Sequence, residues 1–244
     1  PNGKYALLGT YDSNTTSAAS KNLNCGTTYY YKVRAYAVEN GKAVYSGYSS
    51  VASGKTALSA PKEVKASANT YNTLKISWNK VDGANYYQVY RSSSPNGKYA
   101  LLGTYDSNTA SSISKGLGCG TTYYYKVRAY RWVNGQRVFS GYSSVASGKT
   151  VLPAPKTVKA ERASSSTVKI SWSPVSGGQY YQVYRATSRN GSYALLGTYD
   201  DKTRSSISRS LKKGTTYYYK VRTYRWVNGQ RVFSSFSTVV SATP

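Results

Sequence analysis

Aromatic and cationic side chains alternate along one segment that occurs twice in this sequence, and they offer the clearest chemistry in the chain. The segment reads TYYYKVRAYRWVNGQRVF from Thr122 and TYYYKVRTYRWVNGQRVF from Thr216. Side chains of a β-strand alternate between two faces, so every second residue shares a face. Rings can stack on sugars or bases while the cations pair with anionic groups. This pattern favours binding of an anionic polymer or a glycan.

Residues suited to catalysis are scarce. Histidine, the commonest general base and metal ligand at neutral pH, is absent. Among the eight acids only Asp200 and Asp201 are adjacent, and neighbours in an extended segment point to opposite faces. The sequence therefore predicts a protein that is not an enzyme, with no catalytic, cofactor-binding or metal-binding residues and no cofactor.

The charge balance is strongly positive. Lys and Arg number 33 against 8 Asp and Glu, which gives a formal net charge of +25 and a pI near 9.9. Such a surface attracts polyanions, but high net charge also keeps a tyrosine-rich surface soluble, and both interpretations stay open. No signature of a nucleic-acid-binding module accompanies the charge, so DNA or RNA is not an expected partner. No segment has the pattern of a signal peptide or a membrane span, so membrane insertion is not expected.

A fixed period organises the chain. PNGKYALLGTYDSNT begins at Pro1 and again at Pro95, and GSYALLGTYD places Gly191 opposite Gly97, so both offsets are 94 residues. Repetition at a fixed period indicates an array of similar units. We expect a partial first copy over residues 1–58 and complete copies over 59–150 and 151–244.

Short strands separated by turn residues are predicted within each copy, as in an all-β sandwich. For the second copy the expected strands A, B, C, C′, E, F and G are 63–66, 74–78, 86–92, 99–104, 111–114, 122–133 and 136–147. Asn-Gly between alternating residues is the strongest short hairpin signal. It joins strand F to strand G at Asn134-Gly135, and again at Asn228-Gly229 in the third copy.

Apolar residues recur at matching positions in the two complete copies. In the second copy they are Val64, Leu74, Ile76, Trp78, Tyr87 and Val89, followed by L-x-x-G-T-x-Y-x-Y-x-V-x-A from Leu117. In the third copy they are Val158, Val168, Ile170, Trp172, Tyr181 and Val183, followed by the same motif from Leu211 with Thr223 as its last residue. The pattern resembles the fibronectin type III family over essentially the whole chain. SSSPNGKYALLGT looks like the bacterial branch, which is repeated in secreted and surface proteins.

The resemblance implies a fold and structural roles. Each complete copy would be an immunoglobulin-like sandwich of seven strands, and the first copy would keep only strands C′ to G. Trp78 and Trp172 would fill the centre between the sheets, because an indole buries more apolar area than other side chains. Tyr123 and Tyr217 would be corner tyrosines whose hydroxyls bond back to the backbone near the turn from strand E to strand F.

The same alignment assigns the faces of strand F. With Tyr123 at the corner, Tyr125, Val127 and Ala129 point inward and the residues between them face solvent. The short turn places Trp132 opposite Arg137 as a cation–π pair. The candidate binding face comprises Tyr124, Lys126, Arg128, Tyr130, Trp132 and Arg137, with Tyr218, Lys220, Arg222, Tyr224, Trp226 and Arg231 in the third copy, and strand C adds Tyr86, Gln88 and Tyr90. The alternative is that these side chains simply pack across strands on a hydrated sheet.

Cys25 and Cys119 occupy one repeat position, which is Lys213 in the third copy. A lone thiol without histidine is a poor nucleophile, so we interpret both cysteines as turn residues that precede a glycine. Equivalent points of successive modules should lie about 30 Å apart, whereas a disulfide requires Cα atoms within about 7 Å. We therefore expect no bond between them.

Three functions stay open at this point. Prolines 61, 153 and 155 favour stiff connections between copies, which favours a non-catalytic spacer of a bacterial extracellular protein, either secreted or at the cell surface. The second function is an adhesive module whose basic face binds anionic polysaccharide, wall polymer or another protein. The third is the subunit of an extracellular filament.

The first copy lacks counterparts of strands A, B and C, because Pro1 corresponds to Pro95. No residue of this copy matches Ile76, Trp78 or Tyr87, so its inward side chains would face water. The loss of a core tryptophan alone costs several kcal/mol. We expect this copy to be completed by upstream sequence of the same protein or by strands of a neighbouring chain.

Overall fold

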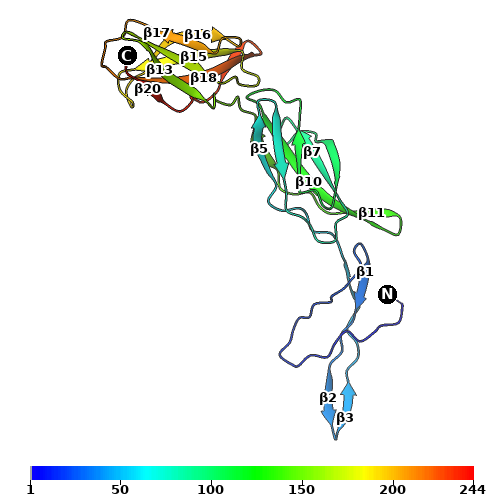
Figure 1. The fold of residues 1–244 in the computed structure, drawn as a ribbon. Coiled ribbons are helices and arrows are strands. Elements are labelled where there is room, and N and C mark those ends of the chain that lie inside the picture. The colour runs from blue at the N-terminus through cyan, green and yellow to red at the C-terminus, as the bar shows by residue number, and fades with distance from the viewer. Residues whose placement is uncertain (1) are drawn as a thin grey trace.

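The computed structural model of the chain describes residues 2–244. All the regular secondary structure within that range is β-strand. Two sandwiches follow one another, and a smaller pair of two-stranded sheets precedes them, so the chain is elongated (Figure 1). The predicted all-β, tandem-sandwich fold is confirmed. No helix of the length and apolarity needed to cross a membrane is found among residues 2–244.

The second copy forms the middle sandwich in Figure 1. Its smaller sheet has the order β5-β6-β9, with β5 (Lys65–Thr70), β6 (Thr73–Ser77) and β9 (Ser111–Ser114). Its larger sheet has the order β11-β10-β7-β8, and β12 also pairs with β10. These strands are β7 (Tyr86–Ser92), β8 (Ala100–Asp106), β10 (Thr122–Val133), β11 (Gln136–Phe139) and β12 (Ala146–Lys149).

The third copy repeats this arrangement. Its smaller sheet has the order β13-β14-β17, with β13 (Val158–Ser164), β14 (Thr167–Trp172) and β17 (Ser205–Ser208). Its larger sheet has the order β16-β15-β18-β19, and β20 also pairs with β18. These strands are β15 (Tyr180–Ala186), β16 (Ala194–Asp200), β18 (Tyr217–Val227), β19 (Gln230–Phe233) and β20 (Val240–Ala242).

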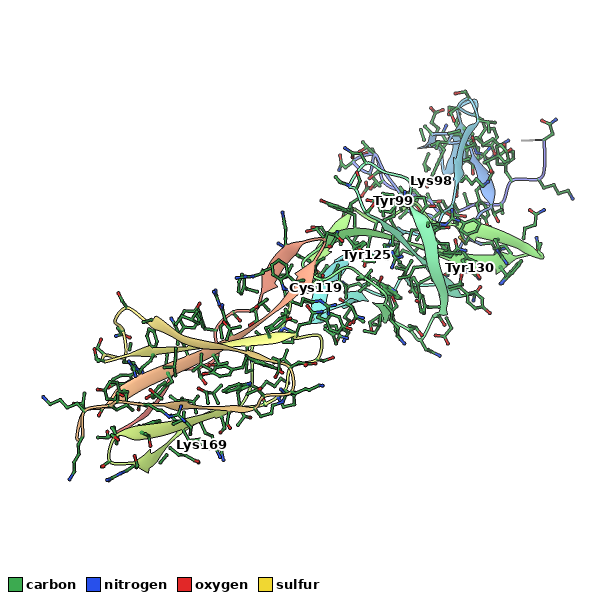
Figure 2. All side chains as sticks on the ribbon, turned by 90° about the horizontal axis from the view of Figure 1, so that it is seen from above. Lys98, Tyr99, Cys119, Tyr125, Tyr130 and Lys169 are labelled. Carbon is green, nitrogen blue, oxygen red and sulfur yellow. The ribbon has the colours of Figure 1, made fainter. Side chains whose placement is uncertain are left out.

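A tryptophan fills the centre of each sandwich. Trp78 is 3% exposed, and its ring centroid lies 5.5 Å from that of Tyr87 and 5.8 Å from that of Tyr105 in the facing sheet. Trp172 is buried in the same way in the third copy. The inward residues of strand F, among them Tyr125 (Figure 2), are fully buried. The predicted core positions of both tryptophans are confirmed.

The corner tyrosines also make the contacts expected of them. The hydroxyl of Tyr123 accepts a hydrogen bond from the backbone N–H of Gly118 at 3.0 Å. The hydroxyl of Tyr217 accepts one from the N–H of Lys212 at 3.1 Å. Each bond fixes the turn from strand E to strand F. This turn lies at the distal end of the module, the end that points toward the following module in the chain.

Strand A begins later than predicted. β5 starts at Lys65 rather than at Glu63, because Glu63 has φ 51°, in the left-handed region that a strand does not use. The predicted hairpin is confirmed. Asn134 and Gly135 have φ 48° and 75°, as the tight turn requires, and Trp132 pairs with Arg137 across the two strands.

Strand G is broken in two, where one strand over 136–147 was expected. Between β11 and β12, Ser140 and Ser143 each exchange two hydrogen bonds with strand F. Their amides donate to the carbonyls of Ala129 and Val127, and their hydroxyls accept from the N–H groups of the same residues. The serine side chains thus replace backbone carbonyls in the ladder, and the residues between them bulge outward.

The first copy is less complete than predicted. β1 (Thr28–Tyr31) pairs with β4 (Ala52–Lys55), and β2 (Tyr36–Glu39) pairs with β3 (Lys42–Tyr45). These strands correspond to F and G alone. The expected C′ and E strands are not formed within residues 2–58, since their pairing strands C and B have no counterpart in this copy.

The inner face of the first copy is open. Val33, whose counterpart Val127 is fully buried, is 71% exposed. A hollow of about 410 Å³, lined by residues 3–8, Ser20 and β1, lies between the segments that correspond to β8 and β10, where the second copy holds β7. Completion of this copy by other strands stays a prediction.

We expect Trp78→Ala to lower the free energy of unfolding of the second copy by about 3–5 kcal/mol, the range for deletion of a large aromatic side chain from a core. Urea unfolding followed by NMR peaks of each copy would measure this. The third copy serves as the internal reference, because Trp172 remains in place there. Equal destabilisation of both copies would contradict separate cores.

Candidate functional site

Cations and rings interlock on the outer face of the larger sheet of the second copy. The Nζ atom of Lys126 lies 4.4 Å from the ring centroid of Tyr99 and 4.1 Å from that of Tyr142. Tyr99 reaches it from the C′ side of the sheet, and Tyr142 from the bulge in strand G. The ammonium group is therefore held between two aromatic faces, an arrangement that stabilises a cation by about 0.5–2 kcal/mol.

Arg128, two residues further along strand F, is bound more tightly. Its Nε donates to Oε1 of Gln88 at 2.9 Å, and its Nη2 donates to the hydroxyl of Tyr90 at 2.8 Å. Its guanidinium carbon lies 4.0 Å from the ring centroid of Phe139. These partners are neutral, so the contacts hold the guanidinium without cancelling its charge.

Tyr130 corrects the predicted binding face, because it is only 4% exposed. Its ring stacks on that of Tyr86 at 5.1 Å with an interplanar angle of 17°, and the ring of Phe139 lies 5.3 Å away. Gln88, also expected to be exposed, is buried beneath Arg128. The alternation prediction was right about the face, but it could not foresee that large neighbours would cover these two side chains.

Trp132 and Arg137 form the exposed end of this arrangement. Trp132 is 45% exposed, and the guanidinium carbon of Arg137 lies 5.0 Å from its ring centroid, so the predicted cation–π pair is confirmed. Tyr124, at the other end of strand F, is half-buried. We call the series Lys126, Arg128, Tyr130, Trp132 and Arg137, with the rings of Tyr99, Tyr142 and Phe139, the cation–aromatic ladder.

The third copy carries the same ladder. Lys220 lies between Tyr193 and Phe236, and Arg222 donates to Gln182 and Tyr184. Tyr224 is buried on Tyr180, as Tyr130 is on Tyr86, whereas Trp226 and Arg231 are exposed and pair at 5.0 Å. Tyr218 is half-buried. In the first copy Lys32 contacts Tyr5 and Tyr48, but Val38 and Ala43 stand where the exposed Trp and Arg would be.

Three of the acids close a turn that recurs in every copy. The Oδ1 atom of Asp106 accepts hydrogen bonds from the hydroxyl of Thr109 at 2.8 Å and from its N–H at 2.9 Å. These bonds, the hydroxyl first, hold the pKa of the Asp106 carboxyl below its ordinary value. Asp12 and Asp200 bond their threonines in the same way. Within residues 2–244 no group of three His, Cys, Asp or Glu side chains could hold a metal ion.

The first and second copies each pack against the copy that follows. We call each of these two contacts between successive copies a joint. Between the second and third copies, Cys119 belongs to the buried cluster that contains Trp172 and Tyr181 of the third copy. A Cβ atom on Gly120 would lie 3.0 Å from Cγ1 of Val232, so the backbone corner touches the F–G hairpin directly. Figure 2 shows Cys119 where the two sandwiches meet.

Two further elements strengthen this joint. Tyr71, in the A–B turn of the second copy, packs on Gly177, and the guanidinium carbon of Arg225 lies 4.8 Å from the centroid of its ring. Arg225 also donates through Nη1 to the carbonyl of Gly177 at 3.1 Å. Leu152, in the connection between the copies, is buried in the same cluster as Trp172.

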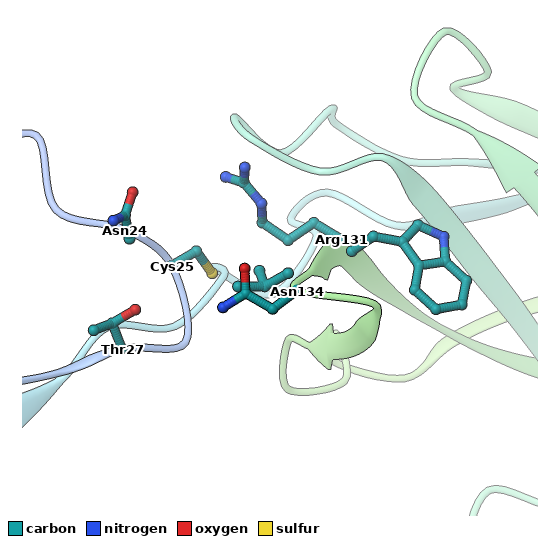
Figure 3. Close-up of a pocket in the computed structure, with 7 residues that line it drawn as sticks. Asn24, Cys25, Thr27, Arg131 and Asn134 are labelled. Carbon is teal, nitrogen blue, oxygen red and sulfur yellow. The ribbon is translucent and has the colours of Figure 1, made fainter.

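The joint between the first and second copies uses the same positions. Cys25 packs against the cluster that contains Trp78, and Leu58 is part of that cluster. A Cβ atom on Gly26 would lie 2.9 Å from Cγ2 of Val138. A hollow of about 290 Å³, lined by Asn24, Cys25, Thr27 and residues 131–134, lies beside this contact (Figure 3).

The two cysteines are therefore more than turn residues, which the sequence interpretation missed. Both are free thiols, and burial raises the pKa of the Cys119 thiol. A small apolar side chain at this corner lets the next module approach closely. The signal was present in the repeat: Cys stands at this position in the first and second copies, and Lys213 stands there in the third.

Comparison with known proteins places these modules in a family. No family model matches the chain. It is 27% identical over 231 residues to mouse fibronectin type III domain-containing protein 7, a match that covers 94% of this chain and 29% of the relative. Mouse tenascin-N is 25% identical over 177 residues, which is 69% of this chain and 11% of that protein. The chain is a tandem array of fibronectin type III modules. It spans under a third of the length of these relatives.

Among solved structures, a segment of two fibronectin type III domains from chicken tenascin is similar with a TM-score of 0.48 and 21% identity, covering 75% of this chain and 99% of that one. A fibronectin type III-like protein from Clostridium thermocellum has 31% identity and a TM-score of 0.34, covering 39% of this chain and 95% of that one.

We expect Arg128→Met to destabilise the second module by about 1–3 kcal/mol, because the buried amide of Gln88 loses a charged donor. Urea unfolding of the full chain would measure the loss. Arg137→Met is the matched control: Arg137 is exposed, and we expect a change within about 0.5 kcal/mol. Equal effects of the two variants would contradict a structural role for the inner part of the ladder.

Proposed function

We propose that this chain is a non-catalytic spacer that holds successive fibronectin type III modules in a fixed serial geometry within an extracellular protein. The observation that carries the proposal is the joint. Its cysteine and glycine–valine contacts recur at both module boundaries, and at each boundary a leucine of the connection is buried in the core of the following module.

Burial of the connection limits how far neighbouring modules can rotate. A connection that ran through solvent would let each module rotate, whereas burial of a leucine side chain contributes about 1.5–3 kcal/mol that bending at that point would have to overcome. The contacts of Gly26 with Val138 and of Gly120 with Val232 brace each joint on a second side. Proline at 61, 153 and 155 limits the backbone further.

The test is an insertion that lengthens one joint. We expect Gly-Ser-Gly-Ser inserted between Thr150 and Val151 to broaden the range of shapes of the full chain in small-angle scattering, while the unmodified chain fits one elongated shape. The same four residues inserted between Arg189 and Asn190, in an exposed turn of the third module, are the control for added length. An unmodified chain that already requires many shapes would contradict the spacer.

A second function, adhesion, is favoured by the exposed pairs Trp132–Arg137 and Trp226–Arg231. Each pair presents an indole and a guanidinium side by side to solvent, a combination suited to the ring and the acidic group of an anionic sugar. The rest of the ladder is occupied internally. If the chain binds an anionic polysaccharide or wall polymer, these pairs are the contacts that we propose.

Adhesion would depend on salt. Retention of the chain on immobilised heparin should fall steeply as salt is raised, because bound cations displace counterions from a polyanion, and it should fall further in the variant with Trp132→Ala and Arg137→Ala. Lys75→Ala removes the same charge from an exposed position on the opposite sheet and is the control. Equal loss in both variants would leave only general electrostatic attraction and would contradict a role for this pair.

The extracellular location of the spacer is part of the same proposal. An extracellular location fits the likeness to tenascin-N and to fibronectin type III domain-containing protein 7. The bacterial origin and the filament function stay predictions.

A further inference from the structure

Copies in this array differ from one another at the residues that form the joints. The distal corner reads Asn24-Cys25-Gly26 in the first copy and Gly118-Cys119-Gly120 in the second, but Lys212-Lys213-Gly214 in the third. Tyr71, whose ring packs on the third copy, corresponds to Ser165. The third copy thus lacks both side chains that the second uses to contact its successor.

The F–G hairpin lies at the proximal end of each module, the end that contacts the preceding module. Here the first copy differs from the other two. They read RWVNGQRVF in the second and third copies, and AVENGKAVY in the first. Ala37 stands where Arg225 donates to Gly177, and Glu39 stands where Val227 packs against the buried cluster of the joint. The first copy therefore lacks two of the proximal contact residues, although it keeps Val44 at the position of Val232, the Asn-Gly turn and the hairpin pairing.

From this pattern we propose that the joint residues encode the order of the modules: the first copy carries only the distal docking surface, the second carries both surfaces, and the third carries only the proximal one. The partner that each surface fits is a neighbouring module of this same type. The inference rests on the proposed function, because it requires that the joints hold the modules in place.

The cost of a wrong neighbour follows from the geometry. A module docked on the distal end of the third copy would bury Lys213 at the place that Cys119 occupies, beside the arginine of the incoming hairpin. A buried ammonium without an anionic partner is strongly unfavourable, and a second cation close by adds repulsion. Ser165 would offer no ring to that arginine. At the other end, Glu39 would place a carboxylate in an apolar contact.

The third copy shows that its corner sequence is compatible with the fold. Tyr217 accepts a hydrogen bond from Lys212 in the same way that Tyr123 accepts one from Gly118. Gly120 and Gly214 share a positive φ, 72° and 75°. Residues of the third corner can therefore be transferred to the second without disturbing its turn.

The experiment transfers these residues within the full chain. In the distal variant, Tyr71→Ser and Cys119→Lys replace the two contact side chains of the second copy with those of the third. In the proximal variant, Arg225→Ala and Val227→Glu give the third copy the hairpin residues of the first. The mirrored variant, with Ser165→Tyr and Lys213→Cys, alters the distal end of the third copy, which forms no joint within residues 2–244, and is kept reduced as the control.

The readout is ¹⁵N relaxation of the second and third copies. We expect one common rotational correlation time in the unmodified chain and in the control, and loss of it in the distal and proximal variants, with chemical shifts of the core amides unchanged. If both variants keep the common correlation time, the proposed code is wrong. Independent tumbling in the unmodified chain would instead overturn the fixed joint, and the code with it. If one variant unfolds, the other variant alone tests the proposal.

Discussion

Strand F is the element on which the rest of this structure depends. Its side chains alternate between the core and the outer face of the sheet, so one strand builds both. In β10 one set of side chains builds the core against Trp78, and the other builds the cation–aromatic ladder. The end of the same strand, at Arg131 and Val133, reaches the preceding module. Core, ladder and joint are therefore held in one register, and a shift by one residue would exchange the two faces.

This sharing explains why so much charge is tolerated on a tyrosine-rich sheet. Lys126 and Arg128 do not simply extend into solvent: rings hold both, neutral acceptors hold Arg128, and Arg128 covers Gln88 in turn. Their contacts order the sheet surface while the chain keeps its positive charge. The contacts that we propose for an external polyanion are then the exposed tryptophan–arginine pairs. The serines that interrupt strand G contribute to the same surface, because the bulge between them brings Tyr142 over Lys126.

Much of this could be predicted from the sequence. The 94-residue period, the Asn-Gly turns and the strand-B tryptophans predicted the sandwiches, the hairpins and the buried indoles. The break in strand G was missed because one regular strand was expected there, whereas Ser140 and Ser143 face strand F three residues apart and shift the register between β11 and β12. The burial of Tyr130 was missed for a different reason, since it depends on Tyr86 and Phe139 from two other strands. The joint was missed because the cysteines were considered as thiols and not as small apolar contacts.

The proposed spacer requires that neighbouring modules form one body through the joint that contains Cys119, Leu152 and Arg225. Residual dipolar couplings of the backbone amides in a weakly aligned sample of the full chain test it most directly. We expect couplings from the second and third modules to fit a single alignment tensor, in the relative orientation seen in Figure 1. Two tensors of different magnitude would show that the modules reorient independently and would contradict it.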